Sequence, residues 1–112
     1  MSETDRELLE FAAKAAGVEL RWHPDGTAFS AVRCSGYWGV WNPLTDDGDA
    51  LRLAVALGMN IDVGSHPVGF TATAVIADHN SVFVDEYHND DAMKATRRAI
   101  VRAAAEIGGA MP

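Results

Sequence analysis

The feature that most constrains the fold is a pair of neighbouring segments, residues 70 to 77 and 81 to 88, which are each apolar on both faces. They are rich in β-branched and aromatic residues, and Asp78-His79-Asn80 between them turns readily, so we predict a β-hairpin. Symmetric closure opposes apolar residues on both faces of this hairpin. The expected pairs are Val75 with Val84, Ala77 with Val82, Ile76 with Phe83 and Ala72 with Tyr87. A sheet that is apolar on both faces needs a cover on each, and amphipathic helices are the available covers.

Three further segments have the apolar spacing of amphipathic helices. Each follows a polar residue suited to an N-cap and precedes a glycine suited to a C-terminal stop. The first expected helix covers residues 4 to 16 and starts with a Thr4/Glu7 capping box. The second is capped by Thr45 and ends at Gly58, and the third is capped by Asn89 or Asp90 and ends at Gly108-Gly109. Alanines give the first and third helices thin faces that allow close approach to a neighbour.

The remaining segments predict additional strands. Residues 18 to 23 alternate apolar and polar side chains, and residues 28 to 34 follow a Pro-Asp-Gly turn, which favours two antiparallel strands. Residues 60 to 69 stay ambiguous between a short strand and a loop, because glycines and a proline interrupt them. This order predicts one α/β (α+β) domain over residues 1–112. We expect a three-layer α-β-α sandwich, in which three helices in total are divided between the two faces of one mixed sheet of about four to five strands.

Composition and charge exclude several classes of protein. Hydrophobic residues make up 48% of the 112 residues, as in a globular chain, and the formal charge of -7 disfavours a nucleic-acid partner. The single Cys34 excludes an internal disulfide and is typical of a cytoplasmic protein. An acidic start is unlike an export signal, and no apolar run approaches the roughly 20 residues of a membrane span. We therefore expect a cytoplasmic protein with no membrane partner.

The segment from Trp41 to Leu53 reads Trp-Asn-Pro-Leu-Thr-Asp-Asp-Gly-Asp-Ala-Leu-Arg-Leu, which resembles a motif of small tailed-phage and prophage proteins, the phage ABA-sandwich domain family. The acidic first helix of that family is similar to residues 5 to 9, and its Arg- and Ala-rich last helix to residues 95 to 104. The resemblance implies helices that sandwich a sheet, an uncharacterised phage or prophage protein in a bacterial host, and no assigned catalytic residue. Independently of the resemblance, Pro43 keeps Asn42 out of the helix that follows, which predicts a rigid connection.

The residues that could bind a metal ion do not converge in the predicted fold. There are four histidines, His23, His66, His79 and His88. His79 lies at the hairpin turn and His88 at its open end, roughly 20 Å apart at about 3.3 Å per residue, so they cannot share an ion. The acidic motif does not match a calcium loop either, because alignment on Gly48 places Pro43 at the first ligand position. We expect no metal.

Catalytic and cofactor signatures are also missing from the sequence. Cys34 has no neighbouring signature of a nucleophile, and the chain contains no Gly-rich phosphate loop. Asp85 shares one face of the predicted hairpin with apolar residues that could desolvate it, whereas a position near the sheet edge would keep it hydrated. We expect no cofactor and no catalytic residue.

The best candidate contact surface is aromatic. Tyr37, Trp38 and Trp41 fall within five residues, and aromatic side chains are common anchors of interfaces. At least one of the two tryptophans is expected to pack inward instead. These three residues form the predicted partner-binding surface.

Three functional interpretations remain. The leading one is a non-catalytic phage accessory protein that binds an unidentified phage or host protein, with the thin alanine faces and the aromatic loop also suited to a homodimer. The second is a small enzyme or ligand-binding domain with a cleft near Asp85, His88 or the aromatic loop, which two titratable groups in one pocket would favour. The third is a nucleic-acid-associated regulator using Arg97, Arg98 and Arg102, although a solvated helix face is the simpler interpretation of that row.

Overall fold

The computed structural model describes residues 3–31, 38–66, 69–76, 82–87 and 91–111. The helices are α1 (Glu3–Ala16), α2 (Asp47–Leu57) and α3 (Ala92–Ala110). The strands are β1 (Leu20–Trp22), β2 (Ala28–Ala31), β3 (Trp38–Val40), β4 (Asn60–His66), β5 (Gly69–Ile76) and β6 (Val82–Tyr87). They form two three-stranded antiparallel sheets, in the orders β1-β2-β3 and β4-β5-β6.

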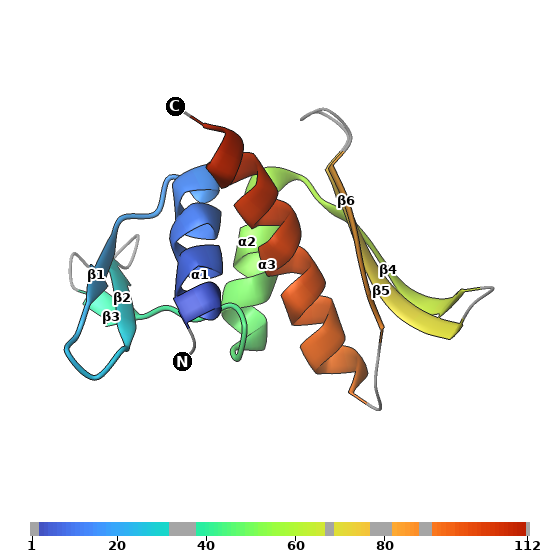
Figure 1. Cartoon of the computed structure of the whole chain (residues 1–112), viewed down its shortest axis with the longest axis horizontal. Helices are drawn as coiled ribbons and strands as arrows, with labels where there is room; N and C mark the ends of the chain where they lie inside the picture. Colours follow the sequence, from blue (N-terminus) through green and yellow to red (C-terminus); the bar gives the residue numbers. More distant parts are fainter. Residues whose placement is uncertain (1–2, 32–37, 67–68, 77–81, 88–90, 112) are drawn as a thin grey trace.

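The helices lie together in the middle of the molecule, with one sheet on each side (Figure 1). The predicted α+β class and the three helices are confirmed. The predicted layer order is not, because the strands flank the helices and no described strand pair is parallel. The physical reason is α3, which is apolar around most of its circumference and therefore needs a cover on more than one side.

Two clusters of apolar side chains meet at α3. Ile100, Val101 and Ala104 pack with side chains of α1 and α2, whereas the opposite side of the helix packs against Val84 of β6. That second side consists of Ala95, Ala99, Ala103 and Ile107. The buried positions of α3 therefore lie on two sides of the helix, while Met93 near its start is exposed.

The thin alanine faces are used inside the protomer. Ala12 and Ala13 of α1 and Ala104 of α3 are buried together in the core. The approach is closest at Gly108, where an added Cβ atom would lie 1.8 Å from the carbonyl oxygen of Phe11. Gly108 therefore does not stop α3 as predicted, since the helix continues to Ala110 and the glycine serves the contact with α1.

The hairpin is confirmed, but its predicted register is wrong by one residue. Val75 pairs with Phe83, and Ile76 pairs with Val82. The prediction assumed a two-residue turn, which requires an even number of residues between paired positions, whereas the observed pairs are separated by an odd number. The predicted turn at residues 78 to 80 lies outside the described residues.

This register gives the β4-β5-β6 sheet one apolar face and one mixed face. Val82 and Val84 pack toward α3. The opposite face carries Asp62, Asp85 and the 58%-exposed Tyr87, and no described helix covers it. The expectation of a cover on both faces fails because a one-residue shift moves polar positions onto the outer face. Residues 60 to 69, which the sequence left ambiguous between strand and loop, contain β4 at 60 to 66 and the first residue of β5 at 69.

Hydrogen-bonding side chains set the helix starts at positions near those predicted. Asp46, and not Thr45, caps α2, since its side chain accepts from the backbone N of Asp49. Asp91, and not Asn89 or Asp90, caps α3 by accepting from the backbone N of Lys94. Gly58 ends α2 as predicted, with a φ of 64° in the left-handed region.

Candidate binding pocket beside Trp41

The segment before α2 is held by hydrogen bonds to one asparagine. The side chain of Asn42 accepts from the backbone N of Leu44, and its carbonyl oxygen accepts from the backbone N of Thr45 and of Asp46. The side chain of Pro43 is fully buried beneath this turn. The predicted rigid connection into the helix is therefore confirmed.

Asp49 ties the same segment to the first turn of α2. It is a charged residue only 8% exposed, and both of its carboxylate oxygens have a partner. Oδ2 accepts from the backbone N of Asn42 at 2.9 Å, and Oδ1 accepts from Arg52 at 2.7 Å. A buried carboxylate needs such partners, so Asp49 fixes the position of Trp41, which directly precedes Asn42.

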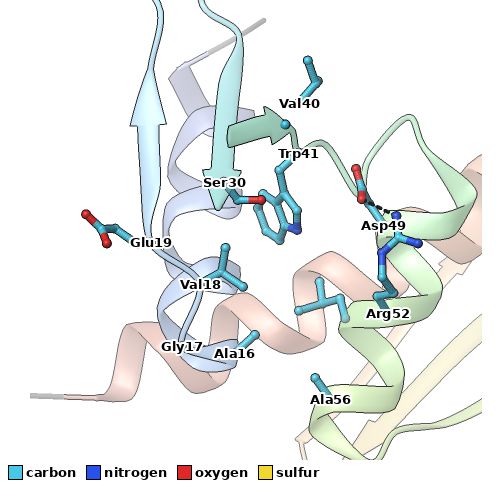
Figure 2. A pocket seen from close by; sticks show the side chains of 12 residues that line it. Ala16, Gly17, Val18, Glu19, Ser30, Val40, Trp41, Asp49, Arg52 and Ala56 are labelled. Atoms are coloured by element: carbon cyan, nitrogen blue, oxygen red, sulfur yellow. Dashed lines mark hydrogen bonds and ion pairs between the residues drawn. The ribbon is translucent and has the colours of Figure 1, made fainter. Parts of the chain in front are cut away.

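An open pocket of about 670 Å³ lies between α2, the end of α1 and the β1-β2-β3 sheet. Its wall is formed by Trp41 and Val18 from the connecting segments and by residues of α1, α2, β2 and β3, among them Leu53. Figure 2 shows that the indole of Trp41 lies between Val18 on one side and Arg52 on the other. The remaining lining residues are Ala16, Gly17, Glu19, Ser30, Gly39, Val40, Asp49 and Ala56.

Trp41 is 7% exposed and belongs to the core cluster, with the pocket against one of its sides. It is therefore not the exposed anchor of an aromatic surface, because its indole packs inward. Trp38 begins β3, and Tyr37 lies outside the described residues. Of the predicted aromatic set, Trp41 is the residue that the structure places at a pocket, and the exposed neighbour there is Val40.

The other sequence-predicted sites lie elsewhere. Asp85 is exposed on β6, away from the pocket, while His79, His88 and Cys34 lie outside the described residues. Within the described part of the chain, no three His, Cys, Asp or Glu residues are placed to hold a metal ion. His23 pairs with Asp25 at 3.1 Å in the β1-β2 turn. Hydrogen bonds from the side chain and then the backbone of Thr27 lower the pKa of Asp25.

The arginine row of α3 connects the layers and is not the solvated face that the sequence predicted. Arg97 donates to the carbonyl oxygen of Leu44 and pairs with Asp47 at 2.6 Å. Arg98 pairs with Asp5 and Glu86, and Arg102 also pairs with Glu86. These guanidinium groups hold α3 to α1, to the start of α2 and to β6.

Sequence reasoning missed most of the pocket. The Asp49–Arg52 pair is separated by three residues on a helix, a spacing that indicates a contact and could have been found. No such signal marks Val18, Ser30 and Ala56. These residues meet at the pocket because of how the β1-β2-β3 sheet is placed on the helices.

None of the models of known protein families matches this sequence. Comparison with curated proteins gives no significant match. Comparison with solved structures gives none either. Among the residues described, no helix combines the length and apolar character of a membrane span.

Proposed function

We propose that this chain is a small, non-catalytic interaction module, a phage or prophage accessory protein of the bacterial cytoplasm, that binds a phage or host protein through the pocket beside Trp41. The observation that carries this proposal is the open pocket of about 670 Å³ with a nearly buried tryptophan in its wall. Concave apolar sites with a few polar groups are the usual places of binding. The resemblance of residues 41 to 53 to phage ABA-sandwich proteins supports the phage setting.

Charge indicates the chemistry of the partner. Glu19 lies at the rim with its carboxylate turned outward (Figure 2), and Asp46 lies 3.9 Å from the guanidinium of Arg52. The chain as a whole has a formal charge of -7. Complementary charge accelerates and orients association, so the partner segment that suits this rim is an apolar side chain flanked by Lys or Arg.

The polar groups in the pocket are arranged for structure and do not form an acid–base pair. Asp49 and Arg52 are within hydrogen-bond distance, which was the signal expected of an enzyme. However, both oxygens of Asp49 are occupied, and an arginine side chain does not release its proton in proteins. The interaction module is therefore favoured over the enzyme.

A small-molecule-binding domain is the second candidate. The observation in its favour is the pocket volume of about 670 Å³, which falls within the roughly 300–1,000 Å³ of small-molecule sites. Binding of an apolar small molecule with no dependence on basic flanking groups would favour this alternative over a protein partner.

Two other interpretations lose their support. The arginines that a nucleic-acid regulator would use are paired with carboxylates of the same chain. The alanine faces that suited a homodimer are buried inside the protomer, which removes one of the two grounds for it. The other ground, the aromatic segment, stays a prediction, and the partner proposed here is a different protein.

The test uses short acetylated, amidated peptides and NMR chemical-shift titration of the whole protein. Lys-Leu-Lys is expected to perturb the signals of Val18, Leu53 and Ala56, more strongly than Lys-Ala-Lys, which lacks the apolar anchor, or Glu-Leu-Glu, which reverses the charge. Equal perturbation by all three peptides, or none at the pocket, would contradict the proposal.

A pair of variants on α2 provides the control. Ala56 is exposed and lines the pocket, whereas Val55 is 73% exposed and is not among the lining residues. Ala56→Phe is expected to fill the pocket and abolish binding, and Val55→Phe to leave it unchanged. Loss of binding in both variants would place the peptide elsewhere on α2.

A further inference from the structure

The indole N–H of Trp41, a residue that is nearly buried, has no acceptor among the described residues. The residue is 7% exposed, and its backbone N donates to the carbonyl oxygen of Ala28 at 2.9 Å. Among the described residues, none accepts a hydrogen bond from Nε1 of Trp41. Buried tryptophan N–H groups normally have a partner, because an unsatisfied buried donor loses its hydration without compensation.

The orientation of the ring points to where the acceptor belongs. Figure 2 shows the indole inside the pocket, with its nitrogen on the side that faces Arg52 and α2. Val18 and Leu53 supply apolar surface nearby. A group that enters the pocket would therefore contact apolar carbon and the free N–H donor at the same time.

The charges around the pocket decide what kind of acceptor fits. Asp49 and Glu19 contribute two carboxylates to the lining. Among the described lining residues the cation is Arg52, which is already paired with Asp49 and lies near Asp46. A ligand carboxylate would be repelled by these acids, and an ammonium group has no lone pair for the indole. A neutral carbonyl oxygen meets both conditions.

We infer that the occupant of this pocket presents an uncharged carbonyl oxygen next to an apolar group, and that this oxygen accepts the hydrogen bond from Nε1 of Trp41. The inference rests on the proposed function, and it makes that carbonyl a main-chain carbonyl of the partner segment, adjacent to the anchoring side chain. Trp41 thus forms part of the pocket wall and also selects a peptide-like group as the ligand.

Three small probes of the same apolar shape separate these chemistries. They are 4-methylpentanamide, which has a neutral carbonyl, 4-methylpentanoate, which is anionic, and 4-methylpentylamine, which is cationic and has no acceptor. The amide is expected to bind about fivefold more tightly than the carboxylate. The amine is attracted by the acids of the rim but has no acceptor, so it is expected to leave the indole N–H of Trp41 unbonded. In wild-type protein the amide should also shift the Trp41 indole N–H cross-peak downfield, distinct from those of Trp22 and Trp38.

Two variants test the donor itself. Trp41→Phe keeps an aromatic ring and removes the N–H, so the affinity for the amide is expected to fall about fivefold, while that for the amine, which makes no such hydrogen bond, is expected to remain. Ser30→Ala removes the hydroxyl of another lining residue and keeps Trp41, so the tighter binding of the amide should persist. The wild-type cross-peak decides the question if Trp41→Phe does not fold.

The outcomes separate the inference from the proposed function. If the three probes perturb the pocket equally and leave the Trp41 cross-peak in place, or if Ser30→Ala alone removes the amide preference, the donor assignment is overturned while the binding pocket stands. If neither these probes nor the peptides perturb the pocket, the proposed function fails and the inference fails with it.

Discussion

Gly108 of α3 meets the backbone of Phe11 on α1 so closely that a Cβ atom at position 108 would lie 1.8 Å from the Phe11 carbonyl oxygen. Helices approach to this distance only when one of them has no side chain at the crossing point. The adjacent Gly109 has no heavy atom within 4 Å of the same hypothetical Cβ. Two neighbouring glycines of one helix thus have different roles.

Gly108→Ala is expected to lower the free energy of unfolding by about 3 kcal/mol, because α1 and α3 must separate to admit the methyl group. Gly109→Ala is expected to raise it by about 0.5 kcal/mol, since alanine has the higher helix propensity. Urea unfolding followed by circular dichroism measures both. Similar effects from the two substitutions would contradict the close helix crossing.

The cap of α2 gives a second prediction. Asp46→Ala removes the side chain that accepts from the backbone N of Asp49 and should cost about 1 kcal/mol of stability. Thr45→Ala, at the position that the sequence favoured as the cap, should change stability by less than about 0.5 kcal/mol. A larger loss for Thr45→Ala in thermal unfolding would restore the sequence-based assignment.

The paired arginines predict a salt-dependent contribution from Glu86. This residue joins Arg98 and Arg102 of α3 to β6, so Glu86→Gln should lower the free energy of unfolding by about 1–2 kcal/mol at low salt and by less in 1 M NaCl. Glu10→Gln breaks only the exposed pair with Arg6 and should cost about 0.3 kcal/mol. Equal costs would show that Glu86 does not connect the layers.

Asp25 predicts a local effect of pH. Its pKa is lowered from 3.8 by hydrogen bonds from Thr27, so the turn gains stability from the carboxylate above pH 3.8 and loses it as the pH falls through the lowered value. An NMR titration of Asp25 should have its midpoint below 3.8. Thr27→Val should move the midpoint of the Asp25 titration upward, and Thr27→Ser should not. The same midpoint in the wild-type protein and both variants would show that the Thr27 hydroxyl does not lower this pKa.

Local signals in the sequence predicted the elements better than their assembly. Periodicity and glycine placed α1 and α2 within about two residues of their bounds, since spacing and capping act over a few residues. The register of β5 and β6 was wrong because a loop of one more or one fewer residue leaves the apolar pattern of each strand unchanged. The α-β-α layer order was not confirmed, because α3 is buried on more than one side and takes the central place that the prediction gave to the sheet.

The candidate site was predicted only through Trp41. The motif at residues 41 to 53 was singled out from the sequence, and Trp41, Asp49, Arg52 and Leu53 of that motif line the pocket. The opposite wall comes from Val18 and Ser30, which reach it because of how the β1-β2-β3 sheet rests on the helices. No local pattern encodes that placement.

The position of α3 has a consequence for how the chain acquires its structure. Side chains of residues 95 to 107 complete both apolar clusters, yet this helix follows every described strand in the chain. During synthesis from the ribosome, the β4-β5-β6 sheet has no supporting surface until α3 emerges, and the cluster between α1 and α2 stays incomplete. A nascent chain without α3 therefore has exposed strand edges and unfilled apolar contacts. Assembly is therefore expected in one late step, with dependence on chaperones greatest just before it.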